Sequence, residues 1–273
     1  MKISVIIGSP RKGFTYKILQ LFEKKINSIQ ECEFKYIFLN QYDLKYCIGC
    51  GKCIDDEMAC PLKDDYVKLK DEMMNSDIVF FCSPVYENHE TALIKNFFDR
   101  FRCFLFRPIF ANRNKYAVLL SVASRTGLFE VLRFLNFVVK GWGFNVENKI
   151  GILSTEFEND KLESIEKYLK GDVDKTKLNA NKYTLDIVNK IEYISRNIVD
   201  SYNRKQPYRP NFDDLVLFKD LKERIIAVKN KYTKAYSFWQ DNDLLNRYYF
   251  SKVKLNPISK LFLKLSKFKF SKN

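Results

Sequence analysis

Four of the seven cysteines in this 273-residue chain lie close together, at Cys47, Cys50, Cys53 and Cys60. Their spacing, C-x2-C-x2-C-x6-C-P, places four thiolates within 14 residues. This suits a 4Fe-4S cluster, because a cubane takes one thiolate per iron. Gly49 and Gly51 free the backbone to wrap around such a centre. Zinc accepts the same ligands, although its sites more often come from two separated C-x2-C pairs. A metal-free thiol loop is the third interpretation, and the tight spacing favours the cluster.

A second polar segment lies near the start of the chain, Gly8-Ser9-Pro10-Arg11-Lys12-Gly13-Phe14-Thr15. It follows an apolar run and precedes a helix-period pattern, so backbone amides, two hydroxyls, a guanidinium and a helix N-terminus meet there. Such a combination binds a phosphate dianion. The segment is neither a Walker loop nor a G-x-G-x-x-G fingerprint, which disfavours ATP and a Rossmann-type NAD site. A plain strand-to-helix turn is the alternative.

Two further polar segments follow later apolar runs. Residues 82–89, Cys-Ser-Pro-Val-Tyr-Glu-Asn-His, offer a rigid proline turn and an aromatic face for a flat heterocycle. Residues 121–127, Ser-Val-Ala-Ser-Arg-Thr-Gly, form the third loop. Open α/β sheets bind ligands beyond the carboxyl ends of their strands, so three loops at one edge predict one pocket.

The elements that must position these loops alternate through the first 155 residues. Short apolar runs predict strands at 3–8, 34–39, 78–82, 116–122 and 145–153, and helix-period patterns predict helices within 18–29, 66–73, 91–102 and 128–140. This is an α/β fold with a doubly wound five-stranded parallel sheet. Charged helical stretches follow at 162–170, 180–204 and 213–240. We therefore expect a ligand-binding domain over residues 1–155 and a helical C-terminal extension over 156–273.

Residues 1–153 resemble the NADPH-dependent FMN reductase branch of the flavodoxin-like superfamily. The resemblance is carried by GSPR at 8–11 with Thr15, by SPVY at 83–86 and by LIKNFFDR at 93–100. The cysteine loop, residues 44–65, resembles the compact motif of the iron-sulfur flavoproteins, a subgroup of this family. The resemblance implies a flavodoxin-like domain that holds FMN non-covalently.

The resemblance also implies roles for individual residues. The FMN phosphate would be held by Ser9, Arg11 and Thr15, and Lys12, Gly13 and Phe14 would be cofactor-binding residues of the same loop. The isoalloxazine ring would be bordered by Pro84, Val85, Tyr86 and Asn88, and its other edge by Ala123, Ser124 and Gly127. Phe14 stands where relatives usually carry Asn, which leaves one phosphate contact to backbone or water. The chemistry needs no triad or carboxylate pair, and we name no catalytic residue.

These features predict an FMN-dependent NAD(P)H oxidoreductase, with electrons passing to a 4Fe-4S cluster or to a second substrate. One alternative is an electron-relay flavoprotein reduced by ferredoxin. Another is a cluster-free quinone, nitro-compound or flavin reductase. The relatives imply at least a homodimer.

The formal net charge of +14 is concentrated in the tail, since residues 244–273 hold eight cations and no acid. No recognition element accompanies them, which disfavours nucleic acid. From Pro257 the pattern predicts a basic amphipathic helix with Ile258, Leu261, Phe262 and Leu265 on one face. We expect residues 257–269 to pack within a dimer in preference to contacting an anionic membrane. Without a membrane-length apolar run or a signal-peptide layout, we expect a cytoplasmic protein.

Other residues receive structural interpretations. Cys32, Cys82 and Cys103 lie in or beside apolar stretches and are expected to be small buried hydrophobes. Asp99 and Arg100 are expected to form structural ion pairs. His89, the one histidine, either meets the ring edge or merely packs.

Overall fold

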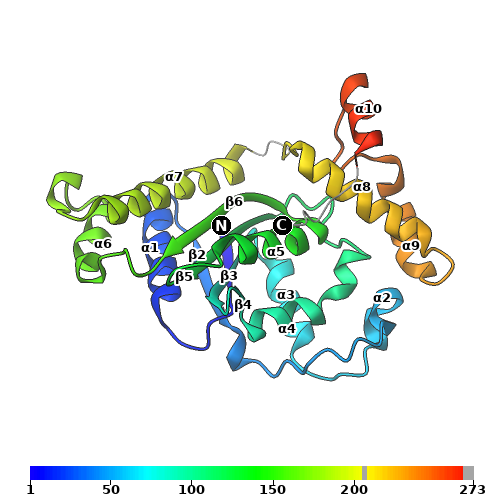
Figure 1. The fold of residues 1–273 in the computed structure, drawn as a ribbon, viewed down its shortest axis with the longest axis horizontal. Helices are drawn as coiled ribbons and strands as arrows, with labels where there is room; N and C mark the ends of the chain where they lie inside the picture. Colours follow the sequence, from blue (N-terminus) through cyan, green and yellow to red (C-terminus); the bar gives the residue numbers. More distant parts are fainter. Residues whose placement is uncertain (205–207, 267–273) are drawn as a thin grey trace.

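The computed structural model describes residues 1–204 and 208–266. Within them, five parallel strands follow the order β2-β1-β3-β5-β6, and a short strand, β4, pairs antiparallel with β3 (Figure 1). The strands are β1 (Lys2–Ile7), β2 (Glu33–Phe38), β3 (Ile78–Tyr86), β4 (His89–Glu90), β5 (Tyr116–Ala123) and β6 (Asn145–Leu153). The predicted doubly wound, five-stranded parallel sheet is confirmed.

The central strands are apolar because both of their faces are covered. All eight residues of β5 are buried, as are the first six of β3. A strand buried on both faces carries a continuous apolar run instead of alternating with polar residues. Such continuous apolar runs are the pattern from which the sequence predicts these strands.

Helices cover both faces of the sheet. One face carries α1 (Phe14–Ile29), α6 (Leu162–Lys170) and α7 (Lys182–Arg204), and the other carries α3 (Tyr66–Asn75), α4 (Ala92–Arg100) and α5 (Leu128–Gly141). Successive residues of β3 serve opposite cores: Phe80 packs on Phe22 of α1, and Phe81 packs on Trp142. The helices α6 and α7 share one hydrophobic core with α1. These two helices of the predicted C-terminal extension therefore belong to the α/β sandwich.

Three more helices follow the sandwich, α8 (Phe212–Ala227), α9 (Thr233–Asp241) and α10 (Pro257–Leu265). They enclose a third core around Phe218 and Trp239, whose ring centroids are 5.5 Å apart. A buried ion pair between Lys140 and Asp214 ties α8 to α5. The predicted helical stretch 213–240 is therefore two helices, because a turn at 228–232 folds α9 back onto α8.

Short helical turns complete the described chain, namely η1 (Leu39–Gln41), α2 (Lys52–Asp55), η2 (Glu57–Ala59), η3 (Arg102–Leu105), η4 (Asn159–Lys161), η5 (Lys175–Lys177) and η6 (Leu244–Asn246). The tail helix begins at Pro257 as predicted, with Asn256 as its N-cap. Residues 267–269 of the predicted tail lie outside the described residues. Among the helices of residues 1–204 and 208–266, none has the length and apolar character needed to cross a membrane.

Candidate functional site

The three predicted loops lie at one edge of the sheet, where β1, β3 and β5 end. In the sheet, β2 lies on one side of β1 and β3 lies on the other, so the strand order reverses at β1. Open α/β sheets bind ligands where the strand order reverses. The Gly8 amide donates to the Cys82 carbonyl (2.8 Å), and the Thr91 hydroxyl donates to the Gly8 carbonyl (2.6 Å). A side chain on Gly8 would meet Ile94 Cβ at 2.7 Å, so this close approach requires glycine.

The first loop forms a cationic turn at the start of α1. Ser9 is buried, and its hydroxyl donates to the Arg11 carbonyl (2.9 Å), which closes the turn. Arg11 and Lys12 are exposed, whereas Thr15 is buried in the first turn of the helix. Among the described residues no side chain caps α1 at Gly13, and its first turn holds no acid. These donors and charges fit a phosphate group.

The second loop is a tight β-hairpin. Val85 pairs with Glu90 and Tyr86 with His89, while Glu87 (φ +46°) and Asn88 (φ +62°) make the turn. The expected proline turn is wrong, because Pro84 lies inside β3 and pairs with Val122 of β5. Tyr86 is 45% exposed and presents an aromatic face.

The third loop docks on this hairpin. The Thr126 hydroxyl donates to Asn88 Oδ1 (2.6 Å). Gly127 adopts φ +89°, and a Cβ there would lie 2.5 Å from Val85 Cγ1. Ser124 is exposed, whereas Ala123 is buried at the end of β5. The structure thus brings the second and third loops into direct contact.

Two polar side chains near this edge, His89 and Ser121, differ in their exposure to solvent. The His89 side chain is 71% exposed, with Nδ1 3.8 Å from Glu90 Oε2, so it does not pack into the protein. Ser121 is fully buried near the end of β5, and its hydroxyl has no hydrogen-bond partner within the described part of the chain.

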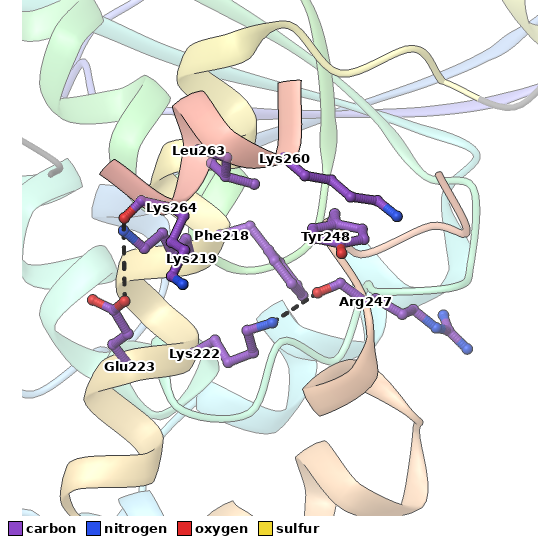
Figure 2. Close-up of a pocket in the computed structure, with 9 residues that line it drawn as sticks. All are labelled: Phe218, Lys219, Lys222, Glu223, Arg247, Tyr248, Lys260, Leu263 and Lys264. Carbon is purple, nitrogen blue, oxygen red and sulfur yellow. Dashed lines mark hydrogen bonds and ion pairs between the residues drawn. The ribbon is translucent and has the colours of Figure 1, made fainter. Parts of the chain in front are cut away.

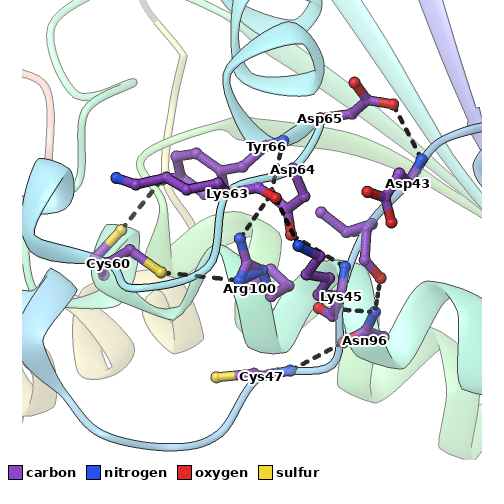
Figure 3. A network of polar contacts seen from close by, with 12 residues as sticks. Asp43, Lys45, Cys47, Cys60, Lys63, Asp64, Asp65, Tyr66, Asn96 and Arg100 are labelled. Carbon is purple, nitrogen blue, oxygen red and sulfur yellow. Dashed lines mark hydrogen bonds and ion pairs between the residues drawn. The ribbon is translucent and has the colours of Figure 1, made fainter.

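The cysteine loop is anchored at both ends by α4, as Figure 3 shows. Asn96 donates to the Leu44 carbonyl (2.8 Å) and accepts from the Cys47 amide (3.3 Å). Arg100 donates to Asp64 (2.8 Å), with side-chain exposures of 2% and 0%. Asp64 also accepts from the Lys45 amide (3.0 Å), which joins the two ends of the loop. The expected structural ion pairs are confirmed for Arg100, and for Asp99 with Lys95.

The four predicted metal ligands have separate surroundings. Cys47 and Cys50 are exposed, Cys53 is partly buried near Cys103, and Cys60 Sγ lies 3.8 Å from Arg100 Nη1. Within the described residues, no three His, Cys, Asp or Glu side chains are gathered to hold a metal ion. The arrangement of the thiols therefore does not fit a cluster as it stands.

The chemistry of the same region favours negative charge. The hydrogen bond with Cys103, aided by Arg107, lowers the pKa of the Cys53 thiol to about 6 against the effect of burial. Arg107 donates to the Cys53 carbonyl (2.7 Å). The Nε groups of Arg100 and Arg107 are buried and have no partner among the residues that the structure describes. The donor types suit an anionic thiolate centre, although their positions do not form one.

The remaining cysteines correct one expectation. Cys82 and Cys103 are buried as predicted, and burial raises the pKa of the Cys82 thiol. Cys103 Sγ also lies 3.4 Å from the Tyr66 hydroxyl. Cys32 is partly exposed and donates to the Gln30 carbonyl (3.0 Å), so its expected burial is wrong. It lies in the turn between α1 and β2, where the chain reaches the surface.

Sequence reasoning missed several residues that position the site. Thr91, which also caps α4, ties the first loop to the second. Asn96 belongs to the LIKNFFDR segment, and this motif was the signal that could have drawn attention to it. Ser121 is the first residue of the third predicted loop but received no role of its own, whereas Arg107 lies outside the motifs and no sequence signal marked it.

Comparison with known proteins agrees with this geometry. Residues 1–150 match the family described as NADPH-dependent FMN reductase. An iron-sulfur flavoprotein of Archaeoglobus fulgidus is 27% identical over 250 residues, covering 90% of this chain and 100% of the relative. An iron-sulfur flavoprotein of Methanosarcina thermophila is 35% identical over 134 residues, covering 46% of this chain and 66% of the relative. A solved flavone reductase shares the fold, with a TM-score of 0.52 at 16% identity over 77% of this chain and 66% of that one.

Proposed function

The chain belongs to the NADPH-dependent FMN reductase family, and on this premise we propose that it is an FMN-dependent oxidoreductase that takes electrons from NAD(P)H. Bound FMN supplies the redox chemistry, accepting a hydride and releasing electrons singly or in pairs. The part of the protein is to bind and orient FMN with the three loops at the carboxyl edge of the sheet.

The observation that carries the proposal is the N-terminus of α1. The free backbone amides of a helix N-terminus attract anions. A capping side chain often accepts a hydrogen bond from one of these amides, as Asn211 does at α8. At α1 no such cap is found among the described residues, while Arg11 and Lys12 add positive charge. We assign the FMN phosphate to this turn, with Ser9 shaping it and the first amides of α1 donating.

The other two loops would hold the ring. Pro84, Val85, Tyr86 and Asn88 belong to the hairpin, and Ser124 and Gly127 belong to the loop docked on it. Tyr86 supplies an aromatic face against which a flat ring stacks favourably. Ala123 is buried, so its contribution is made by the backbone. We assign no proton transfer to His89.

The test of the phosphate assignment is flavin titration of the apoprotein, followed by fluorescence. Replacing both cations, Arg11→Gln with Lys12→Gln, should weaken FMN about tenfold to a hundredfold, because hydrogen bonds to charged groups contribute about 1.5–3 kcal/mol. Riboflavin has no phosphate, so its weaker binding should not change. Lys17→Gln, an exposed lysine on the same helix, is the matched control. Unchanged FMN affinity in the double variant would refute the assignment.

A second candidate function, an iron-sulfur flavoprotein, is favoured by the four thiols of the cysteine loop and the two arginines beside them. Cys47, Cys50, Cys53 and Cys60 would be the ligands. Protein purified without oxygen should then contain about four irons and four sulfides per chain. Cys50→Ala should lose the iron and keep FMN, whereas Cys32→Ala should keep both.

The outcome of the metal analysis also selects the electron partner to test. Iron in the wild-type protein directs the search to ferredoxin as donor. Iron-free protein that binds FMN contradicts the cluster and leaves the loop as plain thiols. Quinones, nitro compounds and free flavin are then the acceptors to assay with NAD(P)H.

A further inference from the structure

The outermost helix of the described chain presents an apolar stripe to solvent. α10 lies beyond α8, away from the sheet (Figure 1). Ile258, Leu261, Phe262 and Leu265 are between 59% and 73% exposed. Their spacing of i, i+3, i+4 and i+7 places them on one helix face. Contiguous exposed apolar side chains of this kind mark interaction sites.

The stripe faces outward because α10 is fixed by its opposite side. Of the nine residues of α10, all described, only Leu263 is buried, and it packs into the third core beside Phe218 (Figure 2). Lys219 of α8 donates to the carbonyls of Lys264 (3.1 Å) and Ser266 (2.6 Å) at the end of the helix. The helix is thus held in place while none of the described residues covers its apolar face.

Positive charge lies on the other side of α10 and in the residues that precede it. Lys252, Lys254, Lys260 and Lys264 are exposed, and the sequence from residue 244 onward holds no acid. A cavity of about 350 Å³ opens between α8, α10 and residues 247–248 (Figure 2). It is lined by five cations and one acid, the cations being Lys219, Lys222, Arg247, Lys260 and Lys264.

We propose that α10 docks the protein on an anionic phospholipid bilayer. The apolar stripe enters the boundary between headgroups and acyl chains, and the exposed lysines on the polar side of α10 and in the preceding residues reach lipid phosphates. Nine helical residues span roughly 14 Å, much less than the roughly 30 Å hydrocarbon core, so the helix lies in the surface plane. A symmetric dimer through this face is disfavoured, because it would bring the lysines of one copy against the same lysines of the other. The sequence from residue 244 onward holds no acid to neutralise them.

Vesicle cosedimentation of the full chain with FMN bound tests the proposal. The protein should pellet with phosphatidylcholine vesicles that contain phosphatidylglycerol, and remain in solution with phosphatidylcholine alone. Added salt should weaken the binding. Lys260→Gln and Lys264→Gln should each weaken it about fivefold, which is the contribution of one basic residue near an anionic surface.

The decisive variant carries Leu261→Glu and Phe262→Glu. It should lose more than about tenfold in vesicle affinity, because two of the four apolar side chains are removed from the stripe. A control with two acidic substitutions elsewhere, Tyr193→Glu with Ile29→Glu, makes the same charge change at exposed apolar sites and should keep most of the binding.

Three results would overturn the proposal. The first is absence of pelleting with anionic vesicles. The second is equal loss in the α10 variant and its control, which would reduce the effect to total charge. The third is a wild-type dimer, seen by light scattering, that the α10 variant converts to monomer without any vesicle binding. Flavin titration is independent of all three, so failure here leaves the FMN assignment intact.

Discussion

Gly127→Ala should disrupt the contact between the second and third loops. Gly127 adopts φ +89°, a left-handed conformation in which a Cβ costs roughly 1–2 kcal/mol. The new methyl would also lie 2.5 Å from Val85 Cγ1 and 2.7 Å from Asn88 Cα. Overpacking of this kind costs about 1–3 kcal/mol. The two effects together predict a loss of about 2–5 kcal/mol in the free energy of unfolding.

The chain offers a matched control in Gly171→Ala. Gly171 adopts φ +93°, but no atom of the described residues lies within 4 Å of the Cβ that would be added. Its substitution should therefore cost only the backbone strain. The change in the unfolded chain is the same for both variants, so the difference between them isolates the steric contact. Gly127→Ala should be the less stable by about 1–3 kcal/mol.

Urea unfolding of both variants measures this difference, and flavin titration measures its consequence. Gly127→Ala should also weaken FMN binding, because Asn88 and Val85 must move, whereas Gly171→Ala should leave FMN affinity unchanged. Equal stability losses in the two variants would refute the steric argument. Unchanged FMN affinity in a destabilised Gly127→Ala protein would show that the docked loops do not border the flavin.

Two other predictions concern stability. Arg100→Met leaves Asp64 buried without its partner and should cost about 3–5 kcal/mol in urea unfolding, whereas Lys95→Met, in an exposed pair, should cost about 0–1 kcal/mol; similar losses would contradict the anchoring role of Arg100. Burial and the hydrogen bond with Glu23 raise the pKa of Tyr36 above its usual value near 10. The stability from this neutral phenol is complete below about pH 10 and falls as the pH rises further, because the unfolded chain ionises first. Tyr36→Phe should reduce that alkaline fall by up to about 1.4 kcal/mol per pH unit, and an unchanged slope in urea unfolding would contradict it.

The sheet was predictable because its central strands are continuous apolar runs. Residues 78–82 and 116–122 have no other satisfactory interpretation between helix-period segments, and both are buried in β3 and β5. The hairpin was not predictable. Its turn uses Glu87 and Asn88, whereas the usual sequence signals are Asn-Gly and Asp-Gly.

The candidate site was predictable as a set of loops but not as a set of contacts. The sequence indicates that residues 8–15 end a strand and begin a helix, which is enough to suggest an anion site. It does not indicate that Thr126 meets Asn88, or that Asn96 and Arg100 anchor the cysteine loop, because these pairs join residues 36 to 49 positions apart. The proximity of the free thiols of Cys53 and Cys103 similarly depends on how that loop packs against η3.

We propose that this chain holds FMN and reduces it with a nicotinamide donor. The most direct measurement is the visible spectrum of the purified FMN-loaded protein, recorded without oxygen before and after addition of NADPH or NADH. We expect a protein-bound flavin spectrum that bleaches with at least one donor and returns when an acceptor is added. A protein that retains no FMN, or a bound flavin that neither nucleotide bleaches, would contradict it.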